Sequence, residues 1–451
     1  MNATIPRRHS AVETMTETED SHESTTLQRY VQLGVLVIVA GAIYPLIYLR
    51  QNFEVTILES FGMSAAQLGQ SYAMLGVLFV LTYIPSGWLA DRVAPRILMS
   101  FSLAMAGLLG IWFSTMPPFE SVRIIFAGWG LATGLTFWSA LIKATAVLAK
   151  PNEQGRFFGI LDGGRGLVEA LLATVAIGMF AYWIESLGQQ PADALRKVIW
   201  FYVAFMLVMS PIVLFIVKDN RRDDTAESGT ASSSFLDDIM VIATRREIWL
   251  AAACILTGYQ LFWATYSFSG YMQIHYGLSA VAVGSITVAK LWMRPIGAAA
   301  AGFAGDFLDR ERVLGGLLLL GAVALAGLVV LPATAGTVVL LAMVLIIGIL
   351  TYAVRGIYWA TLESCNVPNR IKGLAIGAIS LLGYSPDIYL PLINGALLER
   401  FPGKLGYSIY FSGIAVMGVF GAMAAWRLRT IKASPAIAAS GVTSNGLTSS
   451  S

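Results

Sequence analysis

Three charged side chains interrupt the apolar stretch GRFFGILDGGRGLVEALLA, residues 155–173. Asp162, Arg165 and Glu169 are three and four residues apart, so on a helix they share one face and Arg165 can pair with either acid. If the stretch crosses a bilayer, each ionised side chain costs at least about 2.5 kcal/mol. Charges kept at that cost are typical of sites that bind or move ions, and acids so placed could carry protons.

More charges lie in other apolar segments. Lys290 and Arg294 are four residues apart in ITVAKLWMRPIGAA, where like charges repel unless an anion or a carboxylate lies between them. Arg355 lies in TYAVRGIYWA, and Asp387 lies in GYSPDIYLP. We interpret the Lys290 and Arg294 pair as the strongest sign of an anionic ligand.

Basic side chains outnumber acidic ones in these segments. The acids are Asp162, Glu169 and Asp387, and the cations are Arg50, Lys143, Arg165, Lys290, Arg294 and Arg355. A cavity with surplus positive charge favours an anion, which supplies the missing countercharge. The alternative is that these residues pair with one another or extend from helix ends to the membrane surface. For Lys143 we favour that alternative, as an ion pair with Asp162 across a helical hairpin.

The composition is that of a membrane protein. Of 451 residues, 56% are hydrophobic and 13% charged, with a mean hydropathy of +0.69, whereas soluble domains carry about 25% charged residues. The sequence contains two cysteines, Cys254 and Cys365, and their spacing supports neither a disulfide framework nor a metal site. No nucleotide-binding loop, metal cluster or nucleophile motif occurs, so we expect neither an enzyme nor a cofactor.

Twelve apolar segments are long enough to cross a bilayer, which predicts an all-α membrane protein. They form two sets of six, in residues 29–218 and 247–430, joined by a charged, Ser-rich linker at 219–246. We expect disordered tails at 1–28 and 431–451. The predicted spans are 29–53, 66–90, 97–116, 121–149, 156–184, 197–218, 247–273, 279–304, 312–332, 336–361, 372–398 and 405–428.

Most of the 30 Lys and Arg residues fall on the side of the two tails and the linker. By the positive-inside rule both termini are then cytoplasmic, in a multi-pass protein of the plasma (inner) membrane. The lipid bilayer is one expected partner. We expect no nucleic-acid partner, and a monomer.

A short motif recurs after the second and the eighth span. Its copies are GWLADRVAPR, with Gly87, Asp91, Arg92 and Arg96, and GFAGDFLDR, with Gly302, Asp306 and Arg310. Gly allows close helix approach, Asp can face a helix N-terminus, and Arg can pair with carboxylates across the cytoplasmic seam. We interpret both copies as gating elements. Parallel repeats are also how transporters build two bundles around a central site.

The twelve-helix plan with G-x-L-A-D-R-x-x-x-R resembles the major facilitator superfamily. The usual motif has Gly where this chain has Ala94, and the second copy has Phe307 in place of the first Arg. The resemblance covers about residues 29 to 430. It implies two six-helix bundles related by a pseudo-two-fold axis along the membrane normal.

The segments YLRQNF and FGMSAAQLGQSYAM resemble the organophosphate:phosphate antiporters, which include glycerol-phosphate and hexose-phosphate transporters, and LLGYSP resembles their eleventh helix. The resemblance implies that Arg50 binds phosphate in the cavity, whereas hydropathy alone places it at the outer membrane surface. The antiporters also use a basic residue in span seven and a His in span five, and this chain has neither. Its second cation must then be Lys290, Arg294 or Arg355, and a sugar acid, carboxylate or sulfonated sugar fits as well as a sugar phosphate.

Aromatic residues could line such a cavity, because they offer a stacking face and a polar group. The candidates are Tyr48, Trp138 and Tyr384, with Tyr44, Tyr259, Phe262, Trp263 and Tyr266. Helix packing and membrane-interface belts are the ordinary alternative for any one of them.

The sequence therefore predicts a secondary transporter that moves a small organic anion by alternating access. The coupled ion is either an exchanged anion such as phosphate or a proton carried by Asp162, Glu169 or Asp387. A transport-incompetent sensor of such an anion is the alternative. A multidrug efflux carrier fits less well, because it needs a roomier and less basic cavity.

Overall fold

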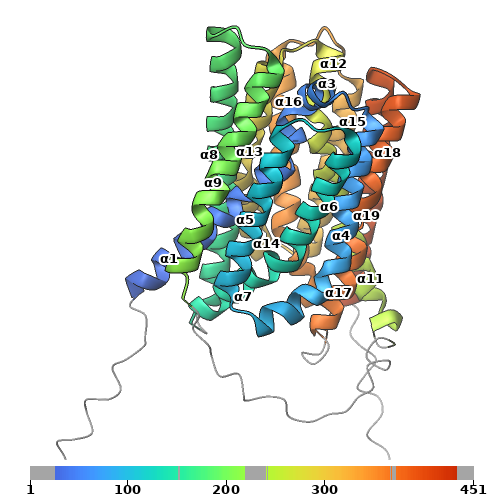
Figure 1. Cartoon of the computed structure of the whole chain (residues 1–451). Coiled ribbons are helices and arrows are strands. Elements are labelled where there is room, and N and C mark those ends of the chain that lie inside the picture. Colours follow the sequence, from blue (N-terminus) through green and yellow to red (C-terminus); the bar gives the residue numbers. More distant parts are fainter. Residues whose placement is uncertain are drawn as a thin grey trace, which may run out of the picture.

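The computed structural model describes residues 26–150, 153–218, 240, 242–365, 367 and 372–433. These residues are almost entirely helical and contain no strand. Most residues of the predicted tails and linker lie outside them. Figure 1 shows a bundle of upright helices with both described chain ends at its lower end, which we call the terminal end; the upper end is the far end.

The first six spans form one bundle. Their elements are α1 (Thr26–Ala42), α2 (Tyr44–Ile47) and α3 (Arg50–Phe61) in span one, α4 (Ala65–Arg92) in span two, α5 (Pro95–Ser114) in span three, α6 (Phe119–Thr136) and α7 (Trp138–Leu148) in span four, α8 (Gln154–Ala181) with the π-helical turn η1 (Tyr182–Ser186) in span five, and α9 (Pro191–Ile216) in span six.

The second bundle contains the other six spans. Its elements are α11 (Arg246–Ala264), the 3₁₀ turn η2 (Thr265–Ser267) and α12 (Phe268–Tyr276) in span seven, α13 (Ala280–Leu291) and α14 (Met293–Phe307) in span eight, α15 (Arg310–Val330) in span nine, α16 (Thr337–Ile357) and η3 (Tyr358–Cys365) in span ten, α17 (Lys372–Gly383) and α18 (Pro386–Arg400) in span eleven, and α19 (Lys404–Ala433) in span twelve.

The predicted twelve-helix architecture is confirmed. Eleven helical stretches of the described residues are long and apolar enough to cross a membrane. The remaining span, span eight, is divided at Trp292 into helices of 12 and 15 residues, each too short to cross alone. Span one is longer than predicted, because α3 continues beyond residue 53 to Phe61 and is capped by Gly62 in the left-handed conformation.

Several spans are broken near the centre of the molecule. Breaks occur in span one at Tyr48, in span four at Phe137, in span eight at Trp292 and in span eleven at Tyr384, and 3₁₀ segments interrupt spans seven and ten. Irregular backbone at membrane depth is tolerated where protein buries it or where it lines a water-filled space. Most predicted site residues lie close to a break: Arg50, Trp138, Arg294, Arg355, Tyr384 and Asp387. The breaks therefore position the site.

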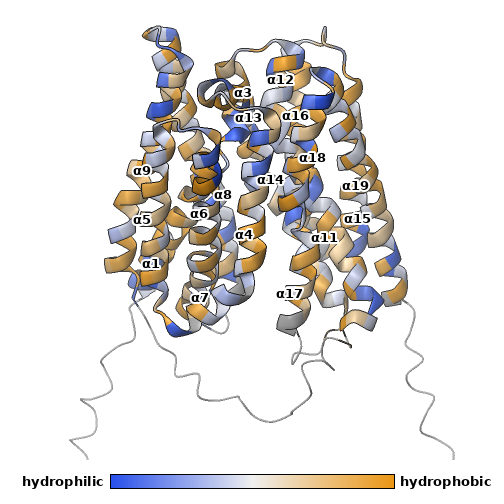
Figure 2. Cartoon of the chain, turned by 45° about the vertical axis from the view of Figure 1, so that its right-hand side comes forward, coloured by the Kyte–Doolittle hydropathy of each residue, from blue (hydrophilic) through white to orange (hydrophobic). Residues whose placement is uncertain are grey.

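The two bundles pack together in the half of the molecule near the far end. There α4 packs along α18, α8 along α13 and α14, and α3 against η2 and α12. Toward the terminal end the bundles diverge, so that α7 and α17 lie apart in Figure 2. The exposed fraction of the Asp162 side chain is 58%, although Asp162 is the ninth residue of the 28-residue helix α8. This conformation is closed at the far end and open at the terminal end.

Two glycines of α4 allow its close crossing with α18. A Cβ on Gly69 would lie 2.3 Å from the carbonyl oxygen of Pro391, and one on Gly76 would lie 2.5 Å from that of Asp387. A side chain at either position would push the helices apart.

We expect Gly69→Ala to weaken closure of the far end. Overpacking of this kind costs about 1–3 kcal/mol, which is roughly a 5- to 150-fold shift in population. A cysteine at Gln51, which is buried in the closed form, would then react faster with a membrane-impermeant maleimide, in a chain whose Cys254 and Cys365 are replaced by Ser. Gly34→Ala is the control, because its Cβ would meet nothing within 4 Å. Equal labelling rates in both variants would contradict the expectation.

Candidate functional site

A cluster of charged residues lies where α8 meets α14. The Arg294 guanidinium donates to Glu169 at 2.8 Å and lies 3.5 Å from the carboxylate of Asp162. Arg165 Nε lies 2.9 Å from the same Asp162 oxygen. Gly166 leaves room for this contact, since a Cβ there would lie 2.6 Å from the Arg294 side chain. One cation from the second bundle is therefore held by two acids from the first.

Arg165 keeps hydrogen-bonding capacity. Its guanidinium lies over the Trp138 ring, 5.2 Å from the centroid. Its Nε is buried and has no aligned hydrogen-bond acceptor among the described residues, despite the short distance to Asp162. The predicted pairing of Arg165 with a neighbouring acid is present. That Trp138 lines a solute cavity stays a prediction.

Arg355 differs from the other cations at the site. Its guanidinium carbon lies 4.1 Å from the centroid of the Phe262 ring and 5.8 Å from that of Tyr259, and the residue is half-buried. Among the described residues it has neither an ion pair nor a hydrogen bond with an acceptor. A guanidinium carries five N–H donors. Arg355 is therefore the cation that is most available to a ligand.

Asp387 is held by neutral donors. Its Oδ1 accepts hydrogen bonds from the Tyr259 hydroxyl at 2.7 Å and from Trp263 Nε1 at 2.6 Å. Both donors belong to α11, whereas Asp387 lies in the first turn of α18 and is buried. Among the described residues it has no cationic partner within ion-pair distance.

Aromatic rings close the site toward the far end. Tyr48 of the first bundle stacks on Tyr266 of the second, with centroids 5.1 Å apart and an interplanar angle of 6°. The Tyr48 ring also lies edge-on to Trp263 at 6.3 Å. Tyr384 accepts a hydrogen bond from Trp359 Nε1 at 2.9 Å and meets Tyr259 edge-on. Tyr48 thus serves as a contact between the bundles in this conformation.

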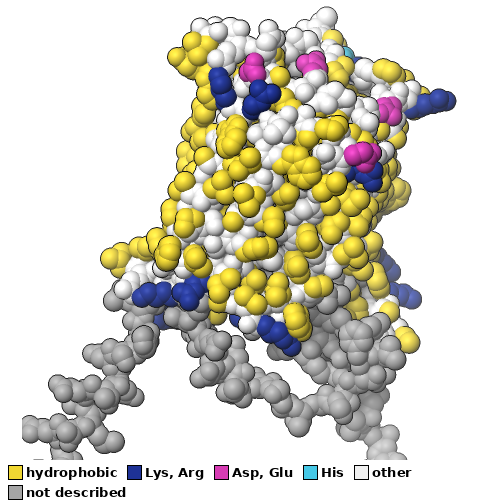
Figure 3. All heavy atoms as spheres, viewed as in Figure 1, with side chains coloured by type: hydrophobic (Ala, Val, Ile, Leu, Met, Phe, Trp, Pro, Cys, Tyr) yellow, Lys and Arg dark blue, Asp and Glu magenta, His cyan; other side chains and the backbone are white. Residues whose placement is uncertain are grey.

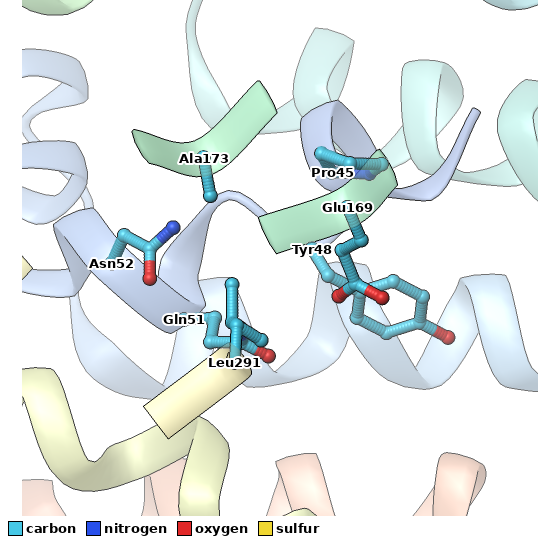
Figure 4. Close-up of a pocket in the computed structure, with 7 residues that line it drawn as sticks. All are labelled: Pro45, Tyr48, Gln51, Asn52, Glu169, Ala173 and Leu291. Atoms are coloured by element: carbon cyan, nitrogen blue, oxygen red, sulfur yellow. The ribbon is translucent and has the colours of Figure 1, made fainter. Parts of the chain in front are cut away.

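A small cavity of about 10 Å³ lies between spans one, five and eight. It is lined by Pro45, Tyr48, Gln51, Asn52, Glu169, Ala173 and Leu291, and Figure 4 shows the Glu169 carboxylate beside the Tyr48 ring. Asn52 Oδ1 is buried without a hydrogen-bond partner in the described part of the chain. A space of this size holds about one water molecule, so it can hydrate these groups but cannot hold an organic solute.

Arg50 is buried, and it is paired within its own helix. Its Nη2 lies 2.6 Å from Glu54 Oε1 and 3.5 Å from the Ser267 hydroxyl of span seven. Glu54 is 1% exposed, and its backbone N–H donates to Ser269. The expectation from hydropathy that Arg50 lies at the outer surface is wrong, because α3 continues the span and carries the pair inside. In this conformation Glu54 already neutralises Arg50.

Lys290 and Arg294 do not face one ligand in this conformation. Lys290 is fully buried and donates to the Thr265 hydroxyl at 3.0 Å, within its own bundle. Arg294 turns to the acids of α8. The cause is the break at Trp292, which separates α13 from α14. From the sequence, Lys290 and Arg294 are placed on one helix face because they are four residues apart, and this does not hold where the helix is interrupted.

The predicted ion pair between Lys143 and Asp162 is wrong. Lys143 Nζ donates to the Ala90 carbonyl oxygen at 3.0 Å. Among the described residues, Asp162 forms its ion pairs with Arg165 and Arg294. In the sequence analysis, Arg294 is treated as a like charge beside Lys290 in span eight and is not paired with Asp162.

The repeated motif lies at the terminal end, where the bundles are apart. A Cβ on Gly87 or Gly302 would meet nothing within 4 Å, so neither glycine is closely approached in this conformation. Arg92 is exposed and lies 4.1 Å from the Trp88 ring centroid. Arg96 and Arg310 are half-buried, whereas the side chains of Asp91 and Asp306 lie outside the described ones. Gating contacts by this motif stay a prediction for the conformation closed at the terminal end.

At the terminal end of the first bundle, Arg29 fixes the start of span five. It donates to Glu153 at 2.6 Å and to the Leu148 carbonyl oxygen at 2.8 Å. The hydrogen bond from Arg29 holds the pKa of the Glu153 carboxyl below its usual range. This contact lies within one bundle, so it supports the position of α8 and its charges.

The structure revises the charge balance of the core. Glu54 pairs with Arg50. Glu54 is not included in the sequence analysis because the residue follows the predicted end of span one. The signal that could have identified the pair is its spacing of four residues, which places both side chains on one helix face. Arg165 and Arg294 pair with Asp162 and Glu169. Among the described residues this leaves Lys290 and Arg355 without an ion pair, against one such acid, Asp387. Lys143 donates to the Ala90 carbonyl oxygen and, in the part of the chain that the structure describes, contacts no acid of this cluster. Without Lys143 the surplus around the site is about one positive charge, and for the six cations of the sequence count the surplus falls from three to two.

Comparison with known proteins identifies relatives along nearly the whole chain. The Major Facilitator Superfamily profile matches residues 34–391. The inner membrane protein YqcE of Escherichia coli K12 is 26% identical over 93% of this chain and 100% of its own length. The glycerol-3-phosphate transporter of Bacillus subtilis is 23% identical over 87% of this chain and 91% of its own, and the hexuronate transporter of that species is 22% identical over 78% and 84%.

Solved structures share the fold. A bacterial homologue of the human lysosomal transporter Spinster, in its inward-facing and occupied conformation, superposes with a TM-score of 0.68 at 14% identity. The match covers 90% of this chain and 98% of that one.

Proposed function

Because this chain belongs to the major facilitator superfamily, we propose that it carries a small organic anion across the membrane by alternating access. Membership makes it a multi-pass membrane transporter and not an enzyme. Two observations support alternating access: the bundles close together at the far end, and they diverge toward the terminal end. If both termini are cytoplasmic, as the positive-inside rule predicts, this conformation faces the cytoplasm.

The observation that carries the proposal is Arg355. It is a half-buried cation at membrane depth, and it has neither an ion pair nor a hydrogen-bond acceptor among the described residues. An uncompensated charge there is costly, and an anionic ligand removes that cost while it is bound. Arg165, Trp138 and Tyr384 add donors and ring faces to the same region.

The charge balance favours a singly charged solute. While Asp387 is ionised, the surplus around the site is about one positive charge, which a carboxylate neutralises. A phosphate ester, with a charge approaching −2 at neutral pH, leaves a surplus of negative charge in that state. The ring faces of Trp138 and Tyr384 and their polar groups suit a sugar-like body. Of the two relatives named for their solutes, the hexuronate transporter fits this reasoning better than the glycerol-3-phosphate transporter. We therefore propose a sugar acid.

We further propose that the coupled ion is a proton carried by Asp387. It is a buried acid that accepts hydrogen bonds from the neutral groups of Tyr259 and Trp263, and among the described residues no cation lies within ion-pair distance of it. It also lies at the α4 and α18 crossing, against Gly76, where the bundles must separate. Acids of this kind in membrane spans are typical of proton relays.

Counterflow in proteoliposomes tests the proposal. Vesicles loaded with unlabelled glucuronate, gluconate, glucose 6-phosphate or glucose would be diluted into the corresponding radiolabelled solute. We expect exchange of the two carboxylates and little of the phosphate or the neutral sugar. An imposed pH gradient should drive net uptake in the wild type. In Asp387→Asn, exchange should persist while the pH gradient no longer drives accumulation. Preference for glucose would contradict the proposal that the solute is an anion. Accumulation driven by the pH gradient in Asp387→Asn would contradict the proposal that Asp387 carries the proton.

A further inference from the structure

A second and larger cavity lies on the surface at the terminal end, far from the charged cluster. It has a volume of about 370 Å³ and is lined by Arg246, Trp249, Leu250, Arg427 and Ile431. The first three belong to the first two turns of α11, and the last two to the final turns of α19. The cavity is therefore a groove between the ends of spans seven and twelve.

The two arginines of this groove have no acidic partner among the described residues. Both Arg246 and Arg427 are exposed. Their neighbour Arg429 differs, because it pairs with Asp309 at 2.8 Å. The groove thus presents two guanidinium groups, and each can bind two phosphate oxygens through its planar fork.

The rest of the groove is apolar and lies at the depth of a membrane surface. Trp249 is 42% exposed, and its indole N–H donates to the Ala243 carbonyl oxygen at 2.9 Å, which fixes the ring. Trp residues concentrate at membrane–water interfaces, and α11 and α19 both begin or end here. On the face drawn in Figure 3, Lys and Arg side chains lie along the lower edge of the hydrophobic surface.

We propose that this groove binds the phosphodiester of an anionic phospholipid. Arg246 and Arg427 contact the headgroup phosphate, and an acyl chain lies along Trp249, Leu250 and Ile431. Basic pockets between transmembrane helices suit lipid headgroups because charge and apolar surface meet there. The bound lipid would hold the start of α11, the helix that carries Tyr259 and Trp263. This site does not depend on the identity of the transported solute.

Native mass spectrometry of the purified full chain tests the proposal, with phosphatidylglycerol and phosphatidylcholine as probes. We expect the wild type to retain phosphatidylglycerol in preference. Each of Arg246→Gln and Arg427→Gln should weaken this binding about fivefold, since a basic residue near an anionic lipid contributes about 1 kcal/mol. The double variant should lose most of the preference. The matched control is Arg123→Gln with Arg400→Gln, which removes two arginines of other helices, one half-buried and one exposed.

Three outcomes would overturn the proposal. The first is equal retention of both lipids by the wild type, and the second is equal loss in the control double variant. The third is displacement of the lipid by millimolar inorganic phosphate, which would show a site for a free anion. The double variant could fail to fold, which would show as aggregation in size-exclusion chromatography. In that case the test uses the two single variants and a second double variant, Arg246→Lys with Arg427→Lys. The lysine pair should retain part of the preference, because it keeps the charge but not the planar fork.

Discussion

Arg355→Gln is expected to abolish concentrative uptake and to weaken solute binding about 10- to 150-fold. The range follows from the 1.5–3 kcal/mol of a hydrogen bond to a charged group. Gln keeps part of the side-chain volume but cannot neutralise a carboxylate. Because Arg355 has no ion-pair partner among the described residues, its removal leaves no acid unpaired there, and the protein should still insert and fold.

Binding of radiolabelled glucuronate to purified protein would measure this effect. Arg355→Lys should fall between the wild type and Arg355→Gln, since it keeps the charge but loses the bidentate geometry. Arg123→Gln is the matched control, because Arg123 is also half-buried and pairs with Glu120 outside the site. Wild-type affinity in Arg355→Gln would remove Arg355 from solute binding.

Glu54→Gln is expected to open the far end. In the closed conformation Arg50 and Glu54 are both buried, at 2% and 1% exposure, so the variant leaves a buried cation without its countercharge. Breaking a buried pair in this way costs about 3–5 kcal/mol. Separation of α3 from η2 and α12 would hydrate Arg50 and remove most of that cost. The closed form should therefore fall in population by roughly 100-fold or more, and uptake should stop.

Labelling of a cysteine at Gln51 reports this shift, as it does for Gly69→Ala. The decisive comparison is the double variant Arg50→Gln with Glu54→Gln, which removes both charges. It should label more slowly than Glu54→Gln alone, because no unpaired charge remains in the closed form. Should the double variant label as fast as the single one, closure would depend on some other property of Glu54. Arg50 would then have no part in holding the far end shut.

The periodic and local features of this molecule could be predicted from its sequence. The long apolar runs with polar boundaries predict twelve membrane-spanning helices, because a helix needs about 20 apolar residues to cross a bilayer and this hydrophobic chain has twelve such runs. The pairing of Arg165 with Asp162 follows from helical spacing alone, because α8 is continuous through both residues. Where a helix is regular, the sequence distance between two charges determines their distance in space.

The breaks and the contacts between bundles could not be predicted in the same way. Hydropathy does not distinguish a continuous span from one divided at Trp292, so Lys290 and Arg294 were assigned to one face. It also ended span one before Glu54, whose burial depends on contacts with span seven. The partner of Arg294 lies on another bundle, 125 residues away. Such pairings depend on how the bundles dock, which a single sequence does not specify.

The central claim is that one intramembrane cation, Arg355, receives the carboxylate of the transported solute. A cryo-electron microscopy structure of the protein with bound glucuronate tests it most directly. We predict density for the carboxylate within about 3 Å of the Arg355 guanidinium nitrogens, with the sugar ring near Trp138 and Tyr384. A carboxylate that pairs instead with Arg50 or Lys290, or a site that remains without ligand at saturating glucuronate, would contradict the account.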